Sequence, residues 1–236
     1  MTMNHPVSII TGAGSGIGAA CARMLAARGH SIVLVGRRAH ALHAVRATLA
    51  THAAHEVIAA DVSHCESAYA VIDETIAKFG RVDSLVLAAG VAPRAPIEAT
   101  TQAILDETFF TNTFGSAYLI TRVWPQLIKQ QSGRIALIST LGTSDPFTGF
   151  FAYAASKSAV DSFARSIRAE GQSIGVHGFA INPGCVETAQ LRRNFPESMV
   201  PAARALPPEA IAEVVVACVC GERDQDSGST IVVASP

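Results

Sequence analysis

A tyrosine and a lysine four positions apart could act together in acid–base chemistry. Tyr153 and Lys157 bound the run Tyr-Ala-Ala-Ser-Lys, and side chains at this spacing share one face of a helix, with Cβ atoms about 5 to 6 Å apart. An ammonium that near makes a phenol more acidic, because it stabilises the phenolate. The spacing alone is weak evidence, since the same pair occurs on many solvent-facing helices. The elements that would position the pair therefore decide what it means.

A glycine-rich turn near the start of the chain indicates a phosphate-binding site. The apolar run 7–10 predicts a buried strand, and residues 11–18 read Thr-Gly-Ala-Gly-Ser-Gly-Ile-Gly. The alanine-rich segment 17–28 then predicts a helix that ends at Gly29. This order places free backbone N–H groups and the positive end of the helix dipole together, which suits a pyrophosphate. The context favours a dinucleotide fold over a flexible loop.

The residues of this turn have distinct expected tasks. Gly12 permits the tight turn, Gly16 lets a phosphate approach the backbone, and Gly18 lets the helix pack closely on the strand. Ser15 and Ile17 are further candidate cofactor contacts in the same turn.

Strands and helical stretches alternate to the end of the chain. Near-continuous apolar runs predict seven strands, at residues 7–10, 31–35, 56–60, 82–88, 134–139, 176–181 and 230–233. Such runs separated by helices indicate a parallel sheet covered by helices on both faces. We therefore expect one α/β domain over residues 1–236 with a doubly wound Rossmann fold, whose ligands bind beyond the carboxyl ends of the strands.

These motifs jointly resemble the short-chain dehydrogenase/reductase family, in its single-domain branch. The residues that carry the resemblance follow in order along nearly the whole chain: Thr11 to Gly18, Asp61-Val62, Ala89-Gly90, Asn112, Ser139, Tyr153-x-x-x-Lys157 and Asn182-Pro183-Gly184. The resemblance implies an NAD(P)-dependent enzyme that interconverts a carbonyl and a secondary alcohol. The catalytic group that it implies is Asn112, Ser139, Tyr153 and Lys157.

Tyr153 is the expected proton carrier. It would protonate the carbonyl oxygen as the cofactor delivers hydride, and it would be the base in the reverse direction. Bringing its pKa from about 10 to about 7 takes roughly 4 kcal/mol. One cation about 4 Å away, at an effective dielectric constant of about 20, supplies about that amount, so Lys157 is expected to cause most of the shift. Burial opposes the shift, and an oxidised nicotinamide adds a second positive charge.

Ser139 and Asn112 complete the expected catalytic group. The Ser139 hydroxyl would orient the substrate oxygen and stabilise negative charge on it, while its neighbour Thr140 could exchange roles with it. The family pattern favours Ser139. The resemblance gives Asn112 a water that links Lys157 to solvent, and a kink or cap inside a helix is the alternative. Lys157 would also bind the nicotinamide ribose hydroxyls.

The end of the second expected strand favours the phosphorylated dinucleotide. Proteins that bind NAD(H) usually carry an acidic side chain there, whereas this chain has Arg37 and Arg38. A guanidinium matches a phosphate, so Arg37, helped by Arg38, is expected to hold the 2′-phosphate of NADP(H), with NAD(H) as the alternative. Both arginines could instead face solvent. Ser15 also stands where relatives that prefer NADP(H) often carry a basic residue.

The resemblance places Asp61 against the adenine, with a backbone contact from Val62. Capping of the next helix, by Asp61 or by Ser63, is the alternative.

The resemblance likewise places Ala89 and Gly90 along the cofactor ribose. The chain departs from the family just before them, where Leu87 and Ala88 replace two usual asparagines. The change puts a hydrogen bond that stabilises the sheet in doubt, rather than the chemistry.

The segment after the sixth expected strand resembles the part of the family that closes over nicotinamide. Pro183 and Gly184 begin it, and the Val186 backbone and Thr188 hydroxyl would bind the carboxamide. A plain proline–glycine turn is the alternative. Cys185 either lines this pocket or is a small core residue.

Residues 189–208 are rich in arginine and proline and predict a mobile substrate lid, before a helix that begins near Pro208. Substrate choice is expected there and in residues 142–151. Arg192 and Arg193 could meet an anionic substrate or an acyl-carrier protein, or else face solvent. Three aromatic side chains are candidates for an apolar pocket wall or for packing elsewhere: Phe147, Phe150 and Phe151.

The composition of the chain limits the kinds of partner that are expected. Eighteen basic and nineteen acidic side chains give a net charge of −1, so neither nucleic acid nor a membrane is expected as a partner. Apolar runs stay well below about 18 residues, and the first residues lack a signal-peptide pattern, so a cytoplasmic location is expected. The five cysteines contain no C-x-x-C pair, so neither a disulfide framework nor a metal site is expected.

Three functional hypotheses follow. An NADP(H)-dependent carbonyl reductase is favoured, with a 3-oxoacyl thioester or acyl-carrier-protein reductase as its nearest variant. A non-catalytic dinucleotide-sensing protein is the second, and the intact catalytic group argues against it. The third is an interaction subunit. In each case the resemblance implies a homodimer or homotetramer, paired through helices near 111–131 and 153–171, and a small-molecule carbonyl or alcohol as ligand.

Overall fold

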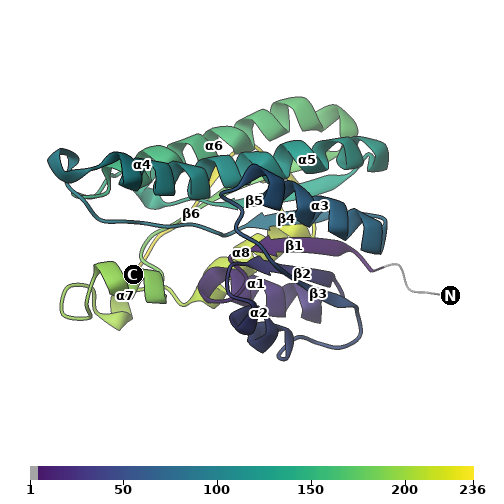
Figure 1. Cartoon of the computed structure of the whole chain (residues 1–236), viewed down its shortest axis with the longest axis horizontal. Coiled ribbons are helices and arrows are strands. Elements are labelled where there is room, and N and C mark those ends of the chain that lie inside the picture. Colours follow the sequence, from purple (N-terminus) through teal and green to yellow (C-terminus); the bar gives the residue numbers. More distant parts are fainter. Residues whose placement is uncertain (1–4) are drawn as a thin grey trace.

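Seven parallel strands form the central sheet in the computed structural model, which describes residues 5–236 (Figure 1). Their order is β3-β2-β1-β4-β5-β6-β7, so the chain winds outward from β1 in both directions. The strands are β1 Val7–Thr11, β2 Ser31–Gly36, β3 His55–Ala59, β4 Ser84–Leu87, β5 Gly133–Ile138, β6 Val176–Pro183 and β7 Thr230–Val233. The predicted doubly wound fold with seven parallel strands is confirmed. The predicted single domain also includes residues 1–4, which lie outside the described residues.

Helices cover both faces of the sheet (Figure 1). The upper layer in that view holds α3 Cys65–Phe79, α4 Gln102–Phe109, α5 Gly115–Gln130 and α6 Phe151–Gly171. The lower layer holds α1 Gly16–Ala27, α2 Ala39–Arg46 and α8 Pro208–Val219. The short helix α7, Ala189–Asn194, lies apart from both, near the C-terminus of the chain.

Alternate side chains of each strand enter opposite layers. On β1, Ile9 packs in the core beneath α3, α5 and α6, whereas Ile10 packs in the core with α1 and α8. Val33 and Leu34 on β2 divide in the same way. Successive strand residues point to opposite faces, so a sheet covered twice requires the continuous apolar runs seen in the sequence.

Two strand boundaries differ from the prediction by two residues, and several others differ by one. The fourth strand was expected over 82–88, but Val82 bonds a side chain instead: its N–H donates to Gln130 Oε1 at 3.1 Å, and its carbonyl accepts from Gln130 Nε2 at 2.7 Å. The sixth was expected to end at 181, but β6 continues to Pro183 because Pro183 pairs with Val233 of β7. Both differences depend on partners distant in the chain.

No helix within residues 5–236 is long and apolar enough to cross a membrane. In the same range, no three His, Cys, Asp or Glu side chains are grouped as a metal site would require.

Candidate active site

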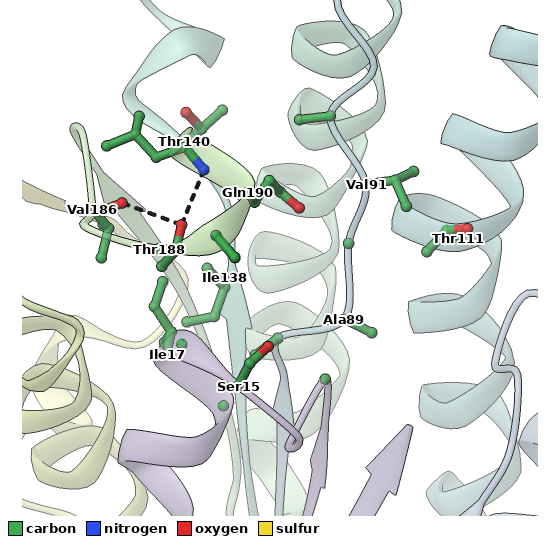
Figure 2. A pocket seen from close by; sticks show the side chains of 18 of the residues that line it. Ser15, Ile17, Ala89, Val91, Thr111, Ile138, Thr140, Val186, Thr188 and Gln190 are labelled. Carbon is green, nitrogen blue, oxygen red and sulfur yellow. Dashed lines mark hydrogen bonds between the residues drawn. The ribbon is translucent and has the colours of Figure 1, made fainter. Parts of the chain in front are cut away.

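A cavity of about 590 Å³ lies beyond the carboxyl ends of the strands. Every residue predicted to bind the cofactor lines it, and so do Ser139, Tyr153 and Lys157 of the predicted catalytic group. Asn112 does not line it. Figure 2 shows Ser15 and Ile17 at the start of α1, near Ile138 at the end of β5 and Thr188 before α7.

The glycine turn has the geometry of an anion cradle. Gly12 and Gly16 have positive φ angles of 64° and 52°. A Cβ on Gly12 would lie 2.8 Å from the Ala88 carbonyl oxygen, and one on Gly18 would lie 2.5 Å from the Gly12 carbonyl oxygen. The Ser15 side chain makes no capping bond within the described residues, which leaves the first N–H groups of α1 for an anion. This turn therefore fits the pyrophosphate of a dinucleotide.

The expected catalytic side chains come from β5 and α6. Tyr153 and Lys157 lie one turn apart on α6 and both face the cavity. Lys157 is 5% exposed, and its Nζ donates to the Ile138 carbonyl at 2.6 Å. Ser139 follows β5, and its hydroxyl donates to the Lys157 carbonyl at 3.3 Å. The end of β5 and helix α6 are thus joined beside the cavity that all three side chains line.

Burial dominates the ionisation of this pair. It raises the pKa of Tyr153 to about 12, against a smaller lowering by Thr140. It lowers the pKa of Lys157 to about 8, against the raising effect of the Asp161 carboxylate. The sequence led us to expect that Lys157 would make the phenol acidic. The chain alone gives the opposite shift, because the loss of hydration disfavours the phenolate more than the hydrogen bond with Thr140 stabilises it.

Thr140, the alternative to Ser139, also lines the cavity. Its side-chain oxygen accepts a hydrogen bond from the Gly142 N–H at 3.2 Å and thereby begins the short turn Leu141–Thr143. Both hydroxyls lie beside the cavity, so Ser139 as the substrate contact stays a prediction.

Asn112 is buried in a π-helical turn, Phe110–Phe114, between α4 and α5. Its Nδ2 donates to the Val91 carbonyl and to Ser156 Oγ, both at 2.9 Å, and its Oδ1 accepts from the Val91 N–H at 2.8 Å. Ser156 Oγ in turn donates to the Tyr153 carbonyl at 2.8 Å. The alternative expectation, a break inside a helix, describes this place well. Asn112 therefore positions α6, and its water contact stays a prediction.

Gly90 leaves room for the lysine. A Cβ at this position would lie 3.2 Å from Asn112 Oδ1 and 3.4 Å from Lys157 Nζ. Just before it, the Ala89 N–H donates to the Thr11 hydroxyl at 3.1 Å. That bond ties β1 to the segment after β4, although Leu87 and Ala88 lack the usual asparagine side chains. Sequence reasoning did not assign this task to Thr11.

The part of the cavity where the adenine is expected carries opposite charges. Arg37 and Arg38 are exposed, and both line the cavity after β2. Burial alone would raise the pKa of Asp61, but hydrogen bonds from Ser63 and the charge of Arg37 outweigh it and lower the pKa. The residue at the cap position of α3 is His64, so the capping alternative for Asp61 and Ser63 is wrong. Instead, Asp61 Oδ1 accepts from the Ser63 N–H and hydroxyl, at 3.0 and 2.7 Å.

Thr188 caps α7 after β6. Its hydroxyl oxygen accepts from the Leu191 N–H and donates to the Val186 carbonyl, both at 3.2 Å (Figure 2). Cys185 lines the cavity, as one of its two expected placements requires, and burial raises the pKa of its thiol. Gly184 lies against Ser235, near the C-terminus.

The two ends of the lid segment, residues 189–208, are held together by backbone hydrogen bonds. Leu206 donates its N–H to the Cys185 carbonyl, and its own carbonyl accepts from the Glu187 N–H, each at 2.8 Å. Arg192 forms an ion pair with Glu187 and donates to the Val200 carbonyl at 2.7 Å, so it stabilises the segment itself rather than facing a substrate. Arg193 is exposed and lines the cavity. The helix predicted near Pro208 is present as α8.

Sequence reasoning missed several residues of the cavity wall. Val91, Gln190, Asn194 and Phe195 line the cavity, but no local motif marks them. For Gln190, Asn194 and Phe195 the available signal was their place in residues 189–208, where substrate choice was expected. Val91 follows Gly90, which was expected on the cofactor side.

Comparisons with known proteins point to one family. Residues 6–198 match the family model described as short chain dehydrogenase. An uncharacterized oxidoreductase of Staphylococcus saprophyticus is 32% identical over 188 residues, 79% of this chain and 80% of that protein. Dehydrogenase/reductase SDR family member 7B of Danio rerio is 32% identical over 189 residues, 77% of this chain and 61% of that protein.

Solved structures agree over almost the whole chain. Levodione reductase has a TM-score of 0.91 at 26% identity, covering 97% of this chain and 96% of that one. A 3-ketoacyl-(acyl-carrier-protein) reductase from Brucella melitensis, complexed with NADH, has a TM-score of 0.90 at 25% identity, with the same coverage. The chain therefore belongs to the short-chain dehydrogenase/reductase family and is an NAD(P)-dependent oxidoreductase that acts on CH–OH and C=O groups.

Proposed function

We propose that this enzyme interconverts a ketone or aldehyde and its alcohol with NADP(H) as the preferred cofactor. One observation carries the proposal: Ser139, Tyr153 and Lys157 face the same cavity as the glycine turn of α1. A proton donor and a dinucleotide cradle thus share one space.

Each side chain has a task in this proposal. Tyr153 is protonated at neutral pH, because burial raises its pKa to about 12, and it is therefore ready to donate to a carbonyl oxygen. Lys157, with its pKa lowered to about 8, can give and take a proton close to neutral pH. Ser139 would donate a second hydrogen bond to the substrate oxygen. The dinucleotide, when bound, supplies the hydride.

Preference for NADP(H) is supported by the residues after β2. Arg37 and Arg38 line the cavity there, and no carboxylate follows β2 directly. A guanidinium forms charge-assisted hydrogen bonds with a phosphate, and these are stronger than its hydrogen bonds with a ribose hydroxyl. NAD(H) is the alternative, and the Brucella melitensis reductase was solved with NADH.

Turnover with a panel of carbonyl compounds tests the proposal. Loss of reduced-nicotinamide absorbance is followed for NADPH and NADH, with ketones, aldehydes and an acetoacetyl thioester. Tyr153→Phe should lower kcat by at least about 100-fold, because it removes the proton donor. Its dinucleotide affinity should stay within about threefold, because the phenol contributes little to binding. A variant that retains wild-type turnover would refute the role of Tyr153. Dinucleotide binding without turnover in either protein would favour a sensing protein.

A 3-oxoacyl thioester reductase is the second candidate. The structural likeness to a 3-ketoacyl-(acyl-carrier-protein) reductase and the exposed Arg193 at the cavity favour it. The acetoacetyl thioester in the panel distinguishes the two candidates.

We also propose that the chain pairs with a second copy through α5. Phe114, immediately before this helix, and Ile128 on it are 43% and 46% exposed, which suits an apolar contact. Light scattering during size-exclusion chromatography would show a dimer or tetramer for wild type and a smaller species for a double variant, Phe114→Glu with Ile128→Glu.

A further inference from the structure

We infer that the substrate of this site is a compact, uncharged ketone that carries a ring, held against an aromatic wall. The inference rests on the proposed function and adds the substrate class to it. Three features carry it: the aromatic wall, the hydrogen-bonded or solvent-exposed state of the charged groups near it, and a clasp of hydrogen bonds that joins the segments around the substrate end.

The wall begins beside the proton donor. The ring centroid of Phe150 lies 6.0 Å from that of Tyr153, at an interplanar angle of 70°. Phe195, from the lid segment, stacks on Phe150 with centroids 5.6 Å apart and an angle of 23°. Phe147 also lines the cavity, and it is 50% exposed to solvent. A carbonyl at Tyr153 would therefore carry its substituent into an aromatic corner, which suits a flat or cyclic group.

Charged groups near this corner are already engaged. Asp61 is the only carboxylate that lines the cavity in the described part of the chain, and it lies at the adenine end. Arg192 is paired with Glu187, and the Arg94 guanidinium lies 5.6 Å from the centroid of the Phe195 ring. The Lys157 ammonium beside Tyr153 donates to the Ile138 carbonyl, and Arg193 is exposed to solvent. A charged substituent would lose its hydration here without gaining a buried partner.

A clasp joins the lid segment to two other segments. Asn194 Nδ2 donates to the Ala92 carbonyl at 2.9 Å, and the Ala95 N–H donates to the Gly149 carbonyl at 2.8 Å. With the stacking of Phe195 on Phe150, these bonds tie the lid segment to the segment after β4 and to residues 149–150. Figure 2 shows Gln190 of α7 and Val91 of that segment on either side of the cavity. A long acyl arm that left the cavity between these segments would have to break these contacts, so the clasp favours a compact substrate.

Five matched compounds test the inference with the full-length wild-type enzyme: acetophenone, cyclohexanone, a linear alkyl methyl ketone, acetylbenzoate and an acetoacetyl thioester. We expect kcat/KM for at least one of the two ring ketones to exceed that for each other compound by at least about tenfold. Phe195→Ala should raise KM for the preferred ring ketone by about tenfold, with little change in kcat, because it removes wall area rather than the proton donor.

Two further variants keep the test decisive. Phe151→Ala is the matched control, since Phe151 is 50% exposed beside Phe150 but does not line the cavity. Its KM should be that of wild type. Phe195→Leu retains apolar volume, so it shows whether Phe195→Ala acts through the wall or through misfolding, with NADPH fluorescence as the check on dinucleotide binding.

The outcomes separate this inference from the function on which it rests. A thioester, a linear ketone or acetylbenzoate used as well as the ring ketones would overturn the substrate class and leave the reductase function standing. An unchanged KM in Phe195→Ala would also overturn it. No turnover of any compound, despite dinucleotide binding, would overturn the proposed function and this inference together.

Discussion

The two ends of the cavity are built in different ways. The cofactor end is mostly backbone: the turn from Gly12 to Gly18 is one continuous run, and its shape depends on positions where a Cβ would collide with backbone. The substrate end is made of side chains from separate segments, among them Phe150 before α6 and Asn194 and Phe195 in the lid segment. The shape of the backbone turn depends on several adjacent residues together, so it suits one kind of ligand. The side chains at the substrate end come from separate segments, so each can be substituted without changing the others. We expect substitutions at the substrate end to alter the choice of ketone without altering dinucleotide affinity.

The largest expected effect is a loss of stability caused by a substitution in the glycine turn. Gly18→Ala would place a methyl group 2.5 Å from the Gly12 carbonyl oxygen, and backbone cannot move aside cheaply. We expect the free energy of unfolding to fall by about 3 kcal/mol, with weaker dinucleotide binding. Gly36→Ala is the control, because its methyl would meet only Leu42 at 3.4 Å. Urea unfolding at one protein concentration would measure both variants, and equal losses would contradict the backbone explanation.

The next prediction concerns the lysine between the two ends. Its pKa falls from 10.5 to about 8, so the buried ammonium costs roughly 3 kcal/mol at pH 7. Lys157→Met removes that cost and also one hydrogen bond of about 1 kcal/mol, so the variant should be inactive but about 2 kcal/mol more stable.

The advantage of Lys157→Met should depend on pH. Below the folded-state pKa of about 8 the folded and unfolded wild type both carry the proton, and the full cost applies. Between about 8 and 10.5 the folded state has lost the proton that the unfolded state retains, so wild-type stability rises with pH and the difference closes. Urea unfolding at several pH values checks this. A constant difference would show that burial of the charge is not its cause.

A smaller effect sharpens the cofactor end. Arg37→Asp should lower the ratio of kcat/KM for NADPH to that for NADH by at least about tenfold. The new carboxylate would repel the 2′-phosphate of NADPH and accept hydrogen bonds from the ribose hydroxyls of NADH. Arg46→Asp, an exposed change on α2 away from the cavity, is the charge-matched control. A ratio that moves equally in both variants would assign the effect to net charge alone.

The smallest effect concerns the substrate end. Asn194→Ala removes the hydrogen bond to the Ala92 carbonyl and should cost about 1 kcal/mol of stability or less. The opened clasp should raise kcat/KM for the acetoacetyl thioester relative to acetophenone, while the dissociation constant for NADPH stays unchanged. Steady-state kinetics and NADPH fluorescence measure the two quantities. An unchanged substrate ratio would show that the clasp does not select for size.

The fold and the glycine turn could be predicted well because their signals are local. Apolar runs identified all seven strands, and the glycine turn identified the start of α1. The boundaries at Val82 and Pro183 were missed, since a glutamine side chain and a neighbouring strand decide them. The position of Asn112 in a helix break was weighed as an alternative, but its partners Val91 and Ser156 could not be known.

The sequence by itself determined the order of the elements, the glycine cradle and the shared face of Tyr153 and Lys157, because each depends on residues adjacent along the chain or one helical turn apart. Only the tertiary structure decided the direction of the two pKa shifts, the clasp at Asn194 and the aromatic corner at Phe195. Desolvation depends on everything that packs around a group, and the clasp joins segments about a hundred residues apart, so neither leaves a local pattern in the chain.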